Sequence, residues 1–201
     1  REEIENSGAR DLVDVLRLIP GFEPLADIGG AISLGSRGIN ATEGKVLLLV
    51  DDQEFNEMFF GIVYFGNQYS LDQIDRIEVI RGPGSAKYGG HAGLAVIKIK
   101  TKGPELNGLQ TSFLHGQQDG LNSRNYLNIT FGNRYDDLGL SISSSIKAGD
   151  GTSNRDYVDL YGDSYSLQDR SDYDQIDFNL GLEYKAFDLR FIIDRYNYYN
   201  K

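Results

Sequence analysis

Few residues in this chain are of the types that usually carry catalysis or metal binding. Cysteine is absent, which excludes thiolate metal sites and disulfides. The two histidines, His91 and His115, lie too far apart in sequence for a zinc-binding helix motif. Asp51 and Asp52 are adjacent, and neighbours on a strand point to opposite faces, so we do not expect them to share one substrate. We therefore predict no catalytic residue, no metal site and no cofactor, and an enzyme is the weakest functional alternative.

The glycines at 82, 84 and 89 form the other pattern with a known chemistry, because glycine-rich turns can cradle phosphate. A phosphate-binding loop continues with Gly-Lys-Ser/Thr and a helix. Here Gly89-Gly90-His91 follows, and the next predicted element, residues 96–100, is a strand. Nucleotide binding is therefore disfavoured, and we interpret these glycines as turn formers.

Composition excludes further classes of function. The formal net charge of −10 argues against a nucleic-acid partner and against polybasic docking to anionic lipid. The longest apolar run, residues 46–50, is far shorter than the roughly 20 residues of a membrane helix. Twenty-four glycines and thirteen tyrosines fit a chain rich in strands and turns. Membrane-spanning strands remain open, because they alternate apolar and polar residues and show no long apolar run.

The first half has the pattern of a small α+β domain ending near Thr101. Leu12, Val15, Leu16 and Ile19 follow helical spacing, which predicts one helix over residues 4–19, capped by Asn6 or Ser7 and ended by Pro20-Gly21. Four strands are predicted, at residues 32–34, 45–50, 77–80 and 94–100. Loops are predicted between them, at residues 27–30, 35–44, 53–68 and 82–93.

The second half alternates apolar and polar residues, which predicts antiparallel strands with unlike faces. The strands are predicted at residues 109–117, 125–132, 138–147, 175–185 and 189–199. Two architectures fit this alternation: a soluble β-sandwich, or part of an outer-membrane barrel. The connections favour the barrel, because 133–137 and 186–188 are short whereas 149–174 is long, and barrels have short periplasmic turns and longer outer loops.

Residues 75–89 read Asp-Arg-Ile-Glu-Val-Ile-Arg-Gly-Pro-Gly-Ser-Ala-Lys-Tyr-Gly and are followed by a strand, Leu94–Lys100. This string resembles the plug of TonB-dependent outer-membrane receptors. Further segments are similar in order and spacing: residues 6–10 and 16–21, 36–39, and 46–51. The chain departs from the family pattern at Leu94–Lys98, where Gly-Gly-Val-Ile-Asn is usual, and at Asp52, where glycine is common.

The resemblance implies an α+β plug domain over residues 1–102, followed by antiparallel strands of a truncated transmembrane β-barrel, about five of them, over 103–201. It implies an outer-membrane receptor that imports a siderophore, haem, cobalamin or glycan. The implied partners are a TonB-type energy-transducing protein, which would bind an N-terminal segment missing here, the nutrient or metal chelate, and outer-membrane lipid. The main alternative is a soluble binding or structural domain with an α+β head and a β-sandwich tail.

The resemblance also suggests roles for particular residues. We expect Ile77, Val79 and Ile80 to pack in the plug core, with the charges of the same strand facing the barrel wall. The plug motif and wall contacts are Arg76, Glu78, Arg81, Gly82, Pro83, Gly84, Tyr88 and Gly89, of which Tyr88 is expected in the core. By position rather than by motif, the candidate substrate-facing loop residues are Asp27, Asn40, Thr42, Glu43, Phe55, Asn56, Phe59, Phe60 and Tyr64. An equal alternative for the aromatic residues among them is that they pack against the barrel.

Residues 149–174 contain seven aspartates and several tyrosines. A solvated acidic loop on the outer side is the simpler interpretation. A calcium site is the alternative, because hard cations favour carboxylates, but no Asp-x-Asp-x-Asp-Gly loop is present.

Overall fold

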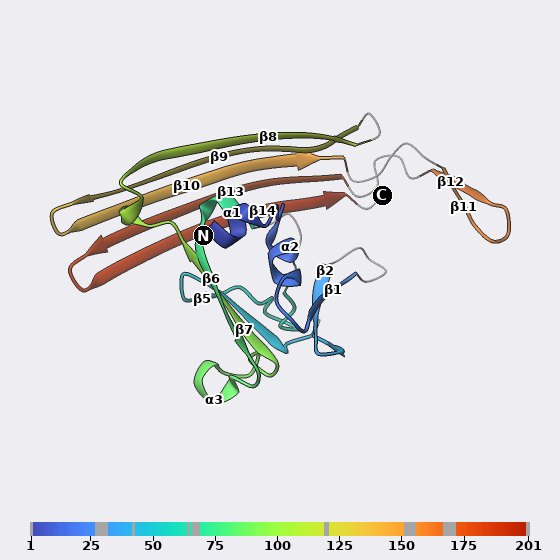
Figure 1. The fold of residues 1–201 in the computed structure, drawn as a ribbon, viewed down its shortest axis with the longest axis horizontal. Coiled ribbons are helices and arrows are strands. Elements are labelled where there is room, and N and C mark those ends of the chain that lie inside the picture. Colours follow the sequence, from blue (N-terminus) through green and yellow to red (C-terminus); the bar gives the residue numbers. More distant parts are fainter. Residues whose placement is uncertain are drawn as a thin grey trace. The chain divides into compact units, whose positions relative to one another are not determined.

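The computed structural model describes residues 2–26, 32–41, 43–63, 65, 69–118, 121–150, 156–166 and 172–199. The chain divides into two compact units, Arg1–Lys102 and Gly103–Lys201. The first unit is mixed α+β, and the second consists mainly of long antiparallel strands (Figure 1).

The first unit contains short elements arranged in two sheets. In chain order they are α1 (Glu2–Asn6), α2 (Leu12–Arg17), β1 (Phe22–Ala26), β2 (Ile32–Ser36), β3 (Ile39–Asn40), β4 (Val46–Val50), β5 (Gln53–Glu54), the 3-10 turn η1 (Leu71–Gln73), β6 (Ile74–Arg81), α3 (Ser85–Tyr88) and β7 (Ala95–Thr101). One sheet has the order β1-β2-β3, and the other has the order β5-β4-β7-β6. The four predicted strands of this half form, while β3, β5 and α3 lie in predicted loops and β1 lies in a stretch for which no element was predicted.

The predicted single helix over residues 4–19 is wrong, because the structure has two helices. Gly8 takes φ +70°, a left-handed conformation that ends the first helix. Asp11 then caps α2, its carboxylate accepting the backbone N–H of Asp14 at 2.9 Å, so neither Asn6 nor Ser7 caps the buried helix. The buried residues of α2 are Leu12, Val13, Val15 and Leu16.

The four-stranded sheet has two unlike faces. β4 and β7 are parallel and β6 is antiparallel to β7, so Leu48, Ile97 and Val79 lie side by side on one apolar face. The opposite face is apolar at one end, where Leu47 and Val96 pack with Ala92, and charged at the other. Ile80 belongs to this second face and is 39% exposed, so its expected place in the core is wrong. The physical reason is strand geometry, since adjacent residues point to opposite sides.

The second unit is built on one five-stranded sheet. Its elements are η2 (Pro104–Leu106), β8 (Gly108–Gln118), β9 (Leu121–Tyr135), β10 (Leu138–Gly149), β11 (Asp156–Val158), β12 (Ser164–Ser166), β13 (Asp172–Tyr184) and β14 (Phe187–Tyr199). The long strands lie side by side in the order β14-β13-β10-β9-β8, and every pair is antiparallel (Figure 1). The five predicted strands are confirmed, and each extends beyond its predicted bounds at one end or both, although β13 stops one residue short of its predicted C-terminal end.

Alternation gives this sheet one apolar and one polar face. Ile129, Ile146, Ile176 and Phe191 lie on the apolar face, and each is 46–53% exposed. Ser144 interrupts that face, and its hydroxyl donates to the Asp177 carbonyl at 2.8 Å. Among the described residues of this unit, the only other sheet is the small β11–β12 hairpin, so no second layer covers the apolar face and the β-sandwich alternative is wrong.

The segment that begins the second unit is fastened to the sheet. The Gly103 carbonyl lies so close to Gly132 that a Cβ there would overlap it, and a Cβ at Gly139 would lie 2.7 Å from Pro104. Glu105 forms an ion pair of 3.6 Å with Arg134. The two glycines on β9 and β10 therefore leave the room that η2 occupies.

Candidate functional site

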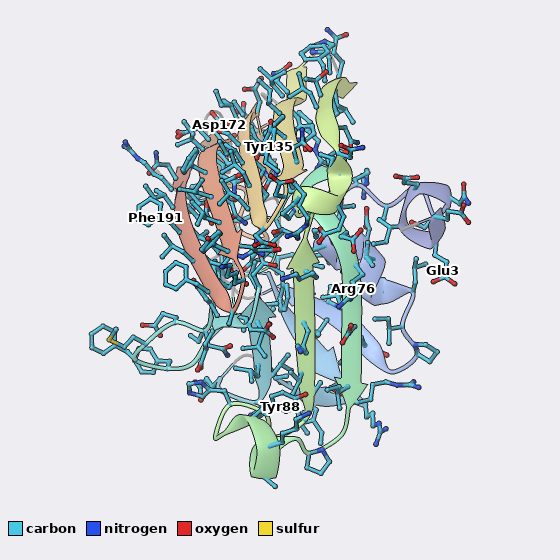
Figure 2. All side chains as sticks on the ribbon, turned by 90° about the vertical axis from the view of Figure 1, so that its left-hand side faces the viewer. Glu3, Arg76, Tyr88, Tyr135, Asp172 and Phe191 are labelled. Atoms are coloured by element: carbon cyan, nitrogen blue, oxygen red, sulfur yellow. The ribbon has the colours of Figure 1, made fainter. Side chains whose placement is uncertain are left out.

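A patch of charged side chains covers one end of the second face of the β5-β4-β7-β6 sheet. Arg76 is the register partner of Lys100, and Glu78 is the partner of Lys98. The Arg76 guanidinium donates to the Glu78 carboxylate at 2.9 Å, and both side chains are more than half exposed. Figure 2 shows Arg76 on β6. Exposed pairs of this kind contribute little to stability, so the patch is available for contacts outside the sheet.

The turn at Asp51 and Asp52 closes the edge of this patch. Both residues have positive φ, 47° and 65°, as a two-residue hairpin turn between β4 and β5 requires. The Asp51 side chain is fully buried and accepts the backbone N–H of Thr101 at 3.0 Å as well as its hydroxyl. Asp52 pairs with Lys98 at 3.3 Å. The two carboxylates thus fasten the turn to β7, and the premise that they lie on a regular strand is wrong.

Arg81 does not share the face of Arg76 and Glu78, which corrects the expectation of one charged row. It lies on the side of Ile77 and Val79, where its guanidinium donates to the Pro20 carbonyl at 3.2 Å. An open groove of about 440 Å³ lies on that side, between the two helices and β6. It is lined by Glu3, Ile4, Val15, Leu18, Ile19, Pro20, Arg76, Ile77, Val79 and Arg81.

The glycine-rich turn after β6 forms part of the frame of the sheet. Gly82 (φ +118°) donates to the Leu94 carbonyl at 2.8 Å, and Gly84 donates to the Ala92 carbonyl at 2.7 Å. A Cβ at Gly84 would lie 3.0 Å from Val96, and Gly89 has φ +93°. A helix does follow, contrary to expectation, but α3 has only four residues, Ser85–Tyr88. Its backbone N–H groups at Lys87 and Tyr88 both donate to Gly84.

Two members of the plug motif differ in exposure. Tyr88 is partly buried against the cluster of Leu47, Ala92 and Val96 (Figure 2), whereas Pro83 is exposed. The structure therefore places Tyr88 in the packing of the sheet, on the side opposite to Ile97.

The loop after β5 presents three consecutive exposed apolar residues. Met58, Phe59 and Phe60 are 90%, 85% and 68% exposed. One Glu57 carboxylate oxygen accepts the N–H of Phe59 at 2.8 Å, and the other accepts that of Phe60 at 2.7 Å. The Glu57 backbone N–H donates to the Ile62 carbonyl at 2.8 Å, and the Glu57 carbonyl accepts the Gly61 N–H at 2.9 Å. Glu57 therefore closes a compact turn that points the three side chains outward.

Asn56 joins this turn to the edge of the sheet. Its Oδ1 accepts the N–H of Leu48 at 2.9 Å, and its Nδ2 donates to the carbonyls of Val46 and Gly61, both at 2.8 Å. The adjacent Phe55 N–H donates to the Leu48 carbonyl at 2.9 Å. The carboxamide thus continues the pairing that β5 begins, so Asn56 has a structural role in addition to its predicted place in a substrate-facing loop.

His91 supports the same turn, a position that was not predicted from the sequence. Its Nδ1 lies 2.6 Å from the Glu54 carboxylate. Gly61 has φ +65°, and a Cβ there would lie 2.7 Å from His91 and 2.9 Å from Gly44. The only sequence signal was the glycines themselves, because close approach of a ring requires them.

The remaining substrate-facing candidates are spread over several loops. Asn40 and Glu43 are exposed, and the Asn40 carbonyl accepts from Lys45 at 3.1 Å. Phe55 is half-buried. Asp27, Thr42 and Tyr64 lie outside the described residues. The described members that the structure brings together are Phe55, Asn56, Phe59 and Phe60.

In the predicted acidic loop the structure places a hairpin, β11–β12. The Asp159 carboxylate accepts the N–H groups of Tyr161 and Asp163 at 2.8 and 3.0 Å. Leu160 and Tyr161 stand out from the tip, 100% and 93% exposed. No group of three or more His, Asp or Glu that could hold a metal occurs among the described residues. Nor does that part of the chain contain a helix long and apolar enough to cross a membrane.

Comparison with known proteins agrees with this fold. Residues 1–96 match the family model of the TonB-dependent receptor plug domain. The chain belongs to the TonB-dependent receptor family. Members related to this chain reside in the outer membrane of Gram-negative bacteria, and that is its location.

Curated relatives include the vitamin B12 transporter BtuB of Vibrio vulnificus, 39% identical over 108 residues. That alignment covers 52% of this chain and 17% of the relative. BtuB of Vibrio cholerae is 38% identical over 103 residues, and this alignment covers 51% of this chain and 16% of the relative. The chain therefore spans about a sixth of the length of these relatives.

Solved structures share the fold of both units. The ferric enterobactin receptor PfeA of Pseudomonas aeruginosa, as its R480A mutant with enterobactin, aligns with a TM-score of 0.69 and 20% identity. The match covers 98% of this chain and 32% of that one. The ferric citrate transporter FecA, in its unliganded form, aligns with a TM-score of 0.68 and 20% identity, and the match covers 98% of this chain and 30% of that one. The predicted architecture, an α+β plug followed by antiparallel barrel strands, is thereby confirmed.

Proposed function

We propose that this chain is part of an outer-membrane active-transport receptor that binds a scarce nutrient and admits it with energy from the TonB system. The nutrient classes considered are ferric siderophore, haem, cobalamin and glycan. The family consists of receptors and transporters and not of enzymes, so we assign no catalytic role to Asp51, Glu78 or His91.

The observation that carries this proposal is the bare apolar face of the second unit. Ile129, Ile146, Ile176 and Phe191 are about half exposed on a sheet whose other face is polar. In water such a surface would favour aggregation, whereas in a bilayer it is the surface that a barrel strand presents to lipid. Strands of 11 to 15 residues are long enough to cross.

The plug supplies a surface suited to movement. The patch around Arg76, Glu78, Lys98 and Lys100 is charged, with Arg76 and Glu78 more than half exposed and the two lysines about one-third exposed. Ion pairs across a wet interface hold two surfaces in register without a continuous apolar seal. Such contacts can be exchanged when the plug is pulled. We therefore assign Arg76 and Glu78 to contacts with the barrel wall.

Substrate contact is assigned to the loops at the other end of the sheet, foremost the turn after β5. The Glu57 turn holds Phe59 and Phe60 outward, and Asn56 fixes that turn to β4. A rigid exposed aromatic surface is what a ring-bearing or chelate ligand requires.

The test is nutrient-limited growth and uptake by the full-length parent receptor in a strain lacking its own transporters. Cells are supplied with iron chelates, cobalamin or oligosaccharides, with and without the TonB-type energy protein. We expect one nutrient to accumulate only when that protein is present, while surface binding persists without it. Equal uptake in both strains would refute energised transport, and failure to bind or import any nutrient class would refute the receptor function.

A further inference from the structure

Three glycines lie close together on the polar face of the second sheet, near its short turns. Gly132 on β9 and Gly181 on β13 are both register partners of Ser141 on β10. Gly139 lies two residues before Ser141 on the same strand and the same face. Glycine weakens the interior of a strand, because it loses much conformational freedom on folding and has no side chain to pack. Three glycines this close together indicate that the space they leave is used.

Residues 103–107, which we call the entry segment, fill two of these spaces. The Gly103 carbonyl lies against Gly132, and a Cβ at Gly132 would lie 3.0 Å from the Cβ of Leu106. A Cβ at Gly139 would lie 2.7 Å from Pro104, whose side chain is fully buried. The entry segment is therefore seated on β9 and β10.

A chain of charges on the same face connects the entry segment with β14, a strand at one edge of the sheet. Glu105 pairs with Arg134 at 3.6 Å. Arg134 reaches across β10 and donates to one carboxylate oxygen of Glu183 on β13 at 2.6 Å. The other oxygen of Glu183 accepts from Arg190 on β14 at 3.0 Å. Arg190 lies over Gly181, which has no side chain to exclude its guanidinium.

Only the β14 end of this chain of charges is firmly held by itself. The Arg190 side chain is 5% exposed and also donates to Asp188 at 3.0 Å. The contact between Glu105 and Arg134 is the longest in the chain, so its Coulomb energy is the smallest. Glu183 fixes the Arg134 guanidinium, and Arg190 fixes Glu183. Both lie on this face only when β13 and β14 are paired in register, because a slip of one residue moves side chains to the other face.

We propose that the entry segment docks firmly on the sheet only after β13 and β14 have paired with β9 and β10 in the correct register. The charges that receive Glu105 are assembled by those two strands, although the seat itself lies on β9 and β10. The connection to the first unit is then fixed late in folding, once the register of four strands is established. This assembly device is independent of the nutrient and of energised transport.

The order of events is tested by pulse-labelled hydrogen exchange while the full-length parent refolds from urea into detergent micelles. Peptides covering β10, β13 and the entry segment are read by mass spectrometry. We expect the amides of β10 and β13 to become protected first. The amides of Leu106 and Asn107, which donate within the entry segment at 3.1 and 3.2 Å, should follow. Protection of Leu106 and Asn107 before β13, or together with it, would overturn the proposal.

The dependence on β13 and β14 is tested in the folded parent with Glu183→Gln and Arg190→Gln. These side chains are two and three links from the Glu105 carboxylate, yet each substitution should make the Leu106 and Asn107 amides exchange about tenfold faster. The estimate follows because a hydrogen bond to a charged group corresponds to roughly tenfold or more in an equilibrium.

Arg195→Gln is the matched control, because Arg195 is on β14 but is the register partner of Ile176 on the apolar face. It should leave the exchange of the entry segment within about twofold of the parent. Where Arg190→Gln does not assemble, Arg190→Lys replaces it, since lysine keeps the charge and loses the fork of donors. If Glu105→Gln loosens the entry segment but Glu183→Gln and the Arg190 variant do not, the dependence on β13 and β14 is wrong.

Discussion

Removing the Asn56 side chain should open the free edge of β4. In Asn56→Ala three hydrogen bonds are lost, and two of them involve the backbone of β4 at Leu48 and Val46. These residues are 0% and 2% exposed, so water cannot easily replace the missing partner. A buried backbone group left unpaired costs about 1–3 kcal/mol, so the two together amount to about 3 kcal/mol.

This free-energy cost can be measured as a faster rate of backbone amide hydrogen exchange in the full-length parent receptor. About 3 kcal/mol corresponds to a local opening that is roughly 100-fold more frequent. The amide of Leu48 should therefore exchange about 100-fold faster in Asn56→Ala, measured by mass spectrometry on peptides covering β4. Asn56→Asp keeps an acceptor for the Leu48 N–H but loses the donor. Its Leu48 exchange rate should therefore fall between that of the parent and that of Asn56→Ala. Asn6→Ala, an exposed asparagine of α1, is the control. An exchange rate within about twofold of the parent in Asn56→Ala would refute the role we give this side chain.

Three further predictions follow from the two units. Arg76→Ala with Glu78→Ala, which removes both proposed contacts with the barrel wall, should impair uptake by the parent more than surface binding of substrate, and equal loss of both would indicate a substrate contact or a folding defect. The hydrogen bond from Arg10 lowers the pKa of Asp14. The Asp14 carboxylate should therefore contribute to stability above a pH of about 4 and lose that contribution as pH falls further. Asp14→Asn should remove this pH dependence of the free energy of unfolding, measured by acid titration. A cysteine at Asp137, in the β9–β10 turn, should react with an impermeant maleimide only after the outer membrane is broken, whereas one at the β11–β12 tip should react on intact cells; the reverse pattern would invert the topology.

The strands of the second unit were predictable because a strand between lipid and water must alternate. Ile176 and Phe178 fall on one face and Asp177 on the other, and this period of two can be read from the sequence alone. The bounds of the strands were less predictable. Strand β9 begins at Leu121, and the three residues that follow, Asn122, Ser123 and Arg124, are all polar and show no alternation in the sequence.

The helices and strands of the plug were harder to predict from local sequence pattern, and most of its predicted fold came from the resemblance to a family. Gly8 and Asp11 split a helix whose apolar spacing looked continuous, because a single left-handed residue outweighs periodicity. Phe59 and Phe60 were found as aromatic loop residues. Their outward presentation depends on Glu57, and on Asn56 reaching back to β4, which are contacts that spacing alone does not specify.

The attachment of η2 to the second sheet decides how that sheet would bear a mechanical load. A pull arriving through the chain at Gly103 first meets Pro104 seated against Gly139 and Glu105 paired with Arg134. The load is therefore shared across β9 and β10 and loads their hydrogen bonds together. Without this attachment, the same force would reach Gly108, the first residue of β8, directly. The three residues of η2 thus transfer part of a pulling force to β9 and β10 before it reaches β8.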